Sequence, residues 1–151
     1  GDIKAYWALL EKTREEYVIV KGDRTYPEVY NKAFFDQAYK LLDRAAKAVA
    51  KAPEKYGKRV EFVRAGLDWT KLIVEVRDLM VRVKKSSGKD AEAVEKVLAN
   101  WAKMEELCKK YPYSINWGPC RPKTPRMAGL HPDHLTKAKK GKAPKKAKGK
   151  K

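Results

Sequence analysis

Two cysteines and two histidines are the residues of this chain best suited to binding a metal ion. Cys108, Cys120, His131 and His134 carry the thiolate and imidazole groups that coordinate zinc in proteins. Zinc sites usually hold their ligands in close pairs, whereas these two cysteines stand twelve positions apart. Only the histidines form a compact pair. We therefore expect ordinary core and loop roles for all four residues, with no metal and no other cofactor.

The same two cysteines could instead form a disulfide bond. Pro112, Gly118 and Pro119 lie between them and could turn the chain back on itself. A cross-link of this length would contribute on the order of 2–3 kcal/mol to stability. If the parent protein is secreted, oxidation is favoured; otherwise both thiols stay reduced, with Cys108 buried on a helix face. The sequence leaves both states open.

Acidic side chains that could act as general acids or bases are plentiful but poorly placed. Catalysis of this kind needs two carboxyl groups in different environments. The candidates lie on charged faces of predicted helices, and they are Glu15, Glu16, Glu61, Asp68, Glu75 and Asp78. Asp68 and Glu75 share a face, where we expect them to meet Arg64 or Lys71. The chain also lacks a phosphate-binding glycine loop and a nucleophile elbow. We assign no catalytic residue to it.

Aromatic residues near the predicted loops could stack on sugar rings or contact a neighbouring domain. The strongest candidates are Tyr26, Tyr30, Tyr113 and Trp117. Other aromatic residues of the chain, such as Trp69 and Trp101, fall on predicted core stripes, so packing is the commoner use of aromatic side chains here. The four residues are nevertheless our candidate carbohydrate or domain contacts.

The positive charge of the chain is concentrated at its C-terminus. Residues 136–151 hold nine of the seventeen excess charges and no acid, whereas residues 1–108 hold 22 basic and 18 acidic side chains. A lysine-rich segment binds phosphate backbones without reading sequence. The candidate polyanion contacts are Lys137, Lys139, Lys140, Lys142, Lys145 and Lys146. No apolar run is long enough for a transmembrane helix.

Four amphipathic helices are predicted to position these side chains. Apolar residues recur at three- and four-residue spacings over roughly 2–17, from 32 to the residues before Pro53, over 54–85 and over 91–110. Helix N-caps are expected at Asp2, Asn31 and Asp90. Pro27 should keep Tyr26 out of a helix. The fold class is therefore all-α, a bundle of about four helices.

The third helix should be central because it carries two apolar stripes. One stripe includes Phe62, Gly66, Trp69 and Ile73, and Gly66 could allow another helix to approach closely. We expect one core in which the side chains of three helices meet, formed by Leu42, Phe62, Trp69, Ile73 and Trp101.

The character of the chain changes after residue 110, where prolines interrupt any regular element. Tyr113, Ile115 and Trp117 are apolar enough to pack back onto the bundle as an irregular wrap. We therefore divide the chain into a helical domain (1–117), a Pro-rich irregular segment (118–135) and a disordered Lys-rich tail (136–151).

Three short motifs in order carry a family resemblance. They are Tyr-Pro-Glu-Val-Tyr at 26–30, Leu-Leu-Asp-Arg-Ala at 41–45 and Arg-Val-Glu-Phe-Val-Arg-Ala-Gly-Leu at 59–67. Over roughly residues 1–110 the chain resembles the α-helical C-terminal region of large bacterial glycoside-hydrolase-like proteins. Those proteins carry this domain of unknown function beside a TIM-barrel-like catalytic domain.

The resemblance implies a non-catalytic accessory domain that packs against an upstream catalytic barrel of the same parent chain. The catalytic carboxylates of such enzymes belong to the barrel, so none is transferred here, and the parent would be extracytoplasmic if it is secreted. The alternative, from the residues themselves, is a nucleic-acid-associated protein that binds phosphate through its Lys-rich tail.

Overall fold

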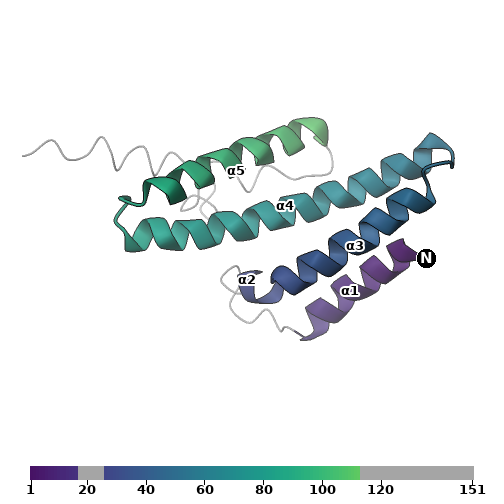
Figure 1. Ribbon diagram of the computed structural model, residues 1–151, viewed down its shortest axis with the longest axis horizontal. Helices are drawn as coiled ribbons and strands as arrows, with labels where there is room; N and C mark the ends of the chain where they lie inside the picture. Colours follow the sequence, from purple (N-terminus) through teal and green to yellow (C-terminus); the bar gives the residue numbers. More distant parts are fainter. Residues whose placement is uncertain (17–25, 113–151) are drawn as a thin grey trace, which may run out of the picture.

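The computed structural model describes residues 1–16 and 26–112, and all regular structure in these ranges is helical (Figure 1). The all-α prediction is confirmed for this part of the chain. The elements are α1 (Asp2–Glu16), α2 (Tyr26–Val29), α3 (Lys32–Ala48), α4 (Glu54–Lys85) and α5 (Ala91–Lys110). The four long helices begin and end within a few residues of their predicted bounds.

The helices form a row in which α4 is the shared neighbour (Figure 1). Helix α1 packs on α3, α3 packs on α4, and α5 packs along the opposite side of α4, while α2 also contacts α4. With 32 residues, α4 is about 48 Å long at the usual rise of 1.5 Å per residue. The prediction that this helix is central is therefore confirmed.

The prediction of a single core is wrong, because the two stripes of α4 face two different clusters. The first cluster joins α1 and α3 to α4 and contains Leu42 and Leu67. The second joins α4 to α5 and contains Val76 and Trp101, with Trp69 and Ile73 packed against it. One long helix presents different sides to partners on its two flanks, so residues predicted to meet are divided between the flanks.

Phe62 departs furthest from its predicted core position, since its side chain is 49% exposed. Phe62 lies in the N-terminal part of α4, close to the residue that follows the C-terminus of α5. Among the described aromatic rings, its ring contacts only that of Tyr111, in an edge-to-face arrangement. No described atom lies within 4 Å of the place where a Cβ on Gly66 would stand. The close approach of a helix at Gly66 is therefore not found.

Two of the three predicted N-caps are confirmed. Asn31 Oδ1 accepts a hydrogen bond from the amide of Phe34, and Asp90 Oδ1 accepts one from the amide of Ala93, each at 3.0 Å. The prediction for Asp2 is wrong, because α1 already includes this residue. The carboxylate of Asp2 instead lies 2.7 Å from a guanidinium nitrogen of Arg44 on α3.

Pro27 and Pro53 both lie at the start of a helix in the structure. Tyr26 belongs to α2 with Pro27 next to it, so the prediction that Pro27 excludes Tyr26 from a helix is wrong. Proline is tolerated in a first turn because amides there have no intrahelical acceptor. Helix α3 ends at Ala48, a few residues before Pro53, and Pro53 is the N-cap residue of α4. The predicted Pro-rich wrap and Lys-rich tail lie outside the described residues, apart from Tyr111 and Pro112.

Candidate functional site

The structure describes the side chain of one of the four candidate aromatic contacts. Tyr30 is half-buried against the first core cluster, and its ring meets Phe34 edge-to-face with centroids 5.1 Å apart. Tyr26 belongs to α2, but its side chain lies outside the described part, as do Tyr113 and Trp117. Packing is thus the visible use of Tyr30 within the described residues.

Cys108 is the described member of the predicted metal and disulfide sets. Burial, followed by the negative charge of Glu105, raises the pKa of its thiol. Both effects disfavour the thiolate, which is the form that binds metal and attacks disulfides. Within residues 1–16 and 26–112 no group of three metal-ligating side chains comes together. Cys120, His131 and His134, and the six tail lysines, lie outside these ranges.

A groove that the sequence analysis missed lies over α4 between α3 and α5. Its volume is about 450 Å³, and Leu72 and Leu107 are its apolar members. The walls alternate in charge, with acidic side chains at Asp68, Glu75 and Glu106 and basic ones at Lys71, Lys103 and Lys110. Equal numbers of each sign leave the groove without the net positive charge that an anion site needs.

Tyr39 anchors the α3 side of this groove. Its hydroxyl donates a hydrogen bond of 2.6 Å to Asp68 Oδ1 on α4. Burial, then the hydrogen bond to Asp68, raises the pKa of the phenol well above its ordinary value. Two cations also lie over the ring, with Lys71 Nζ 5.4 Å and Arg64 Cζ 5.8 Å from its centroid. The ring face is therefore used within the domain.

Asn100 anchors the α5 side of the same region. Its side chain is buried, and Nδ2 donates a hydrogen bond of 3.0 Å to Glu75 Oε2. A second hollow of about 520 Å³ adjoins this pair and shares Glu75 and Lys103 with the groove. The sequence held a signal for Asn100, because a polar residue stands between Val97 and Met104 on an otherwise apolar stripe. These cross-helix bonds fix helix positions rather than create reactive groups.

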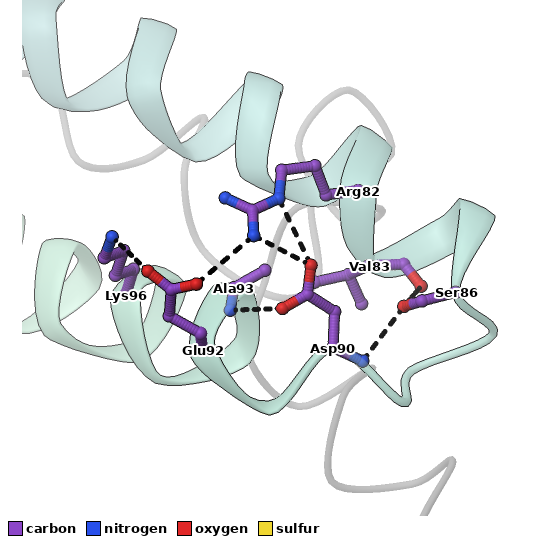
Figure 2. A network of polar contacts seen from close by, with 7 residues as sticks. All are labelled: Arg82, Val83, Ser86, Asp90, Glu92, Ala93 and Lys96. Atoms are coloured by element: carbon purple, nitrogen blue, oxygen red, sulfur yellow. Dashed lines mark hydrogen bonds and ion pairs between the residues drawn. The ribbon is translucent and has the colours of Figure 1, made fainter.

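The turn between α4 and α5 holds a network of polar contacts (Figure 2). The guanidinium of Arg82 on α4 reaches Asp90 at 3.0 Å and Glu92 at 3.5 Å. Glu92 also pairs with Lys96 at 2.6 Å, as the four-residue spacing predicts. The bond from the Ala93 amide, then the guanidinium of Arg82, lowers the pKa of Asp90. Lys96 and Arg82 lower the pKa of Glu92.

These pKa shifts run opposite to those of a catalytic acid. A general acid needs a carboxyl group whose pKa is raised towards neutrality. Asp90 and Glu92 are instead held as carboxylates by an amide and by cations, which is typical of a structural ion network. The network therefore holds the start of α5 against the end of α4.

Large apolar side chains remain exposed along the outer surfaces of the row. Trp7 on α1 is 51% exposed, and Leu98 on α5, at the opposite edge of the row, is 41% exposed. Trp7 is held in place by an edge-to-face contact with buried Tyr6, with ring centroids 5.6 Å apart. An exposed, positioned tryptophan is typical of protein interfaces.

No protein-family model, no curated protein and no solved structure matches this chain. Among the described helices, none combines the length and the apolar character that crossing a membrane requires.

Proposed function

We propose that this chain is a non-catalytic helical domain that supports a catalytic barrel of a glycoside-hydrolase-like parent protein. The family resemblance supplies the partner, and the exposed face of α1 supplies the contact surface. The observation that carries the proposal is the exposure of Trp7. Its side chain is half exposed on the edge helix α1, whereas the adjacent Tyr6, whose ring it contacts, is buried.

The position of α1 supports this choice of surface. Among the described helices, α1 packs mainly on α3, so none of the other described helices covers the side of α1 away from α3 to a comparable extent. Interfaces between domains of one chain are of modest size and more polar than obligate interfaces. Lys4 and Glu11 are exposed and stand three and four positions from Trp7, on the same side of α1, so the exposed aromatic side chain has charged neighbours, as suits an interface of this kind.

The coding sequence that precedes Gly1 gives the first test. The proposal expects an α/β stretch with the strand–helix alternation of a barrel. A binding experiment with that barrel, expressed separately, then tests the surface. Trp7→Lys should weaken binding at least tenfold, whereas the matched control Leu98→Lys, at the opposite edge of the row, should not. Equal binding by both variants would reject α1 as the contact surface.

A second function rests on the tail, because nine lysines and no acid occupy residues 136–151. Such a segment would hold nucleic acid through phosphate contacts alone. This function belongs to a different part of the chain, so a tail that binds DNA and a bundle that supports a barrel are tested independently.

A further inference from the structure

One side of α4 carries apolar residues that the described helices cover incompletely. We call it the α4 stripe: Phe62, Gly66, Trp69 and Ile73, which lie on one side because they are spaced by four, three and four residues. Trp69 and Ile73 pack against the second core cluster. Phe62 is 49% exposed, and a side-chain carbon added at Gly66 would have no described atom within 4 Å.

The chain leaves α5 at one end of this stripe. Tyr111 follows α5 directly, and its amide donates a hydrogen bond of 2.9 Å to the carbonyl of Leu107. Its half-buried ring meets Phe62 edge-to-face, with centroids 6.4 Å apart and planes at 76°. Pro112 comes next and cannot continue the helix without losing an amide donor. The last described residues, Tyr111 and Pro112, therefore end beside Phe62.

We propose that residues 113–117 of this same chain pack along the α4 stripe. Tyr113, Ile115 and Trp117 alternate with polar residues, so an extended backbone would direct all three to one side. Such a segment spans about 13 Å. Phe62 and Ile73 are separated by about 16 Å along the axis of α4. The length and the apolar pattern of the segment therefore match the stripe.

The surroundings of Phe62 favour one direction. On the side of α4 that carries Phe62, the residues towards the N-terminus are the charged Lys55, Lys58 and Arg59. The exposed ring of Tyr56 belongs to another side of the helix, where Lys55 and Arg59 lie over it. Towards Ile73 the stripe continues. A tethered segment also has a high effective concentration, since one residue separates Tyr113 from the Tyr111–Phe62 contact. The chain's own segment therefore outcompetes a second copy or a separate domain for this surface, and this inference does not depend on the proposed function.

The proposal fixes a register that cysteine pairs can test. Gly66 lies about 6 Å beyond Phe62 along α4. Residues 113–115 span about 7 Å when extended, which places Ile115 beside Gly66. A Cys108→Ser/Cys120→Ser background removes both native thiols. In it, Gly66→Cys with Ile115→Cys should form an intramolecular disulfide when oxidised glutathione is added.

Gly57 provides a matched control within the same helix. It also belongs to α4 and has open space for a side chain, but nine residues separate it from Gly66, which puts it on the opposite side. Gly57→Cys with Ile115→Cys should cross-link at least tenfold more slowly. Circular dichroism of each single-cysteine variant checks that the helices are intact.

The outcome is measured by mass spectrometry at low protein concentration. A monomeric 66–115 disulfide, formed much faster than the 57–115 disulfide, is the expected result. Equal rates for the two pairs, no cross-link, or disulfide-linked dimers alone would overturn the proposal, and dimers would assign the stripe to a second copy. In addition, ending the chain after Pro112 should lower the thermal midpoint by several degrees relative to ending it after Leu135. Equal midpoints would also contradict the proposal.

Discussion

The Tyr39 hydroxyl lies 2.6 Å from Asp68 Oδ1 and joins α3 to α4 across 29 positions of sequence. The bond lies beside the first core cluster, where α3 packs on α4. Tyr39→Phe keeps the ring and removes the donor, so it should lower the free energy of unfolding by about 1 kcal/mol. Urea denaturation measures this change, and an unchanged value would show that water replaces the bond at no cost.

The same pair predicts a pH dependence at the alkaline end. The pKa of Tyr39 is raised in the folded state from its ordinary value of 10.0. A raised pKa contributes stability that is fully present below the unfolded value and is lost as the pH rises towards the folded value. The native chain should therefore lose more stability above pH 10 than Tyr39→Phe does. Thermal midpoints of the two proteins from neutral pH upwards test this, and parallel curves would contradict it.

Ser87 is predicted to be a strained residue whose replacement stabilises the protein. It follows α4 with φ of 52°, and its amide donates to Lys84 while that of Gly88 donates to Val83. This is a helix-ending motif that favours glycine at the position of Ser87. Ser87→Gly should raise the free energy of unfolding by about 0.5–1 kcal/mol.

The neighbouring glycine supplies the reciprocal control. Gly88 has φ of 80° and open space for a side chain, so Gly88→Ala should destabilise through backbone strain alone, by about 1 kcal/mol. Denaturant midpoints measure both changes. If Ser87→Gly destabilised the protein, the hydroxyl of Ser87 would have an unrecognised role.

Asp90 should make the α4–α5 turn sensitive to acid. Its pKa is lowered from 3.8, so its contribution is present above that value and is lost as the pH falls through the folded pKa. Asp90→Asn keeps a capping oxygen but loses the ionisation, whereas Asp90→Ala loses both. At neutral pH the thermal midpoints should rank native, then Asn, then Ala. As the pH falls below 3.8, the midpoints of the native protein and Asp90→Asn should approach each other, and they should meet only below the lowered pKa of the folded state; a constant difference would contradict the assignment.

The two core clusters should behave as separate sites. Leu42→Ala in the first and Val97→Ala in the second each remove a side chain that is fully buried. Leu42→Ala should cost about 2–5 kcal/mol. Because the two residues share no cluster, the costs should add within about 0.5 kcal/mol.

Local sequence signals predicted the helices well because each signal acts over a few residues. The caps at Asn31 and Asp90 and the Glu92–Lys96 pair depend on three- or four-residue spacings, which sequence displays directly. The assignment of residues to cores failed at Phe62 because it depends on which neighbour lies beside each stripe. That is a tertiary property, set by where α5 ends.

The sequence could point to a residue of the candidate site only where that residue interrupts an apolar stripe of a helix. Asn100 breaks the apolar stripe of α5, which signals a buried polar partner, but nothing in the sequence identifies that partner as Glu75. The Tyr39–Asp68 bond has no local signal, since Tyr39 stands beside the apolar stripe of α3 and resembles any core aromatic. Pairing across helices requires their packing to be known.

Polyanion binding should reside in residues 136–151. Each phosphate neutralised on duplex DNA contributes roughly −0.9 to the slope of log affinity against log salt, so engaging six lysines implies a slope of about −5. Deleting 136–151 should abolish binding and leave the thermal midpoint nearly unchanged. A salt titration with both chains measures this. If the shortened chain bound equally well, the basic side chains of the remaining body would carry the site.

The central claim, that this helical domain packs against a catalytic barrel through α1, is tested most directly by hydrogen exchange. Amide exchange is measured in the isolated chain and in the parent protein that includes the preceding residues. The account predicts slower exchange in α1, centred on Trp7, with little change in α5. The same exchange rates in α1 in both proteins, or slowing confined to α5, would contradict it.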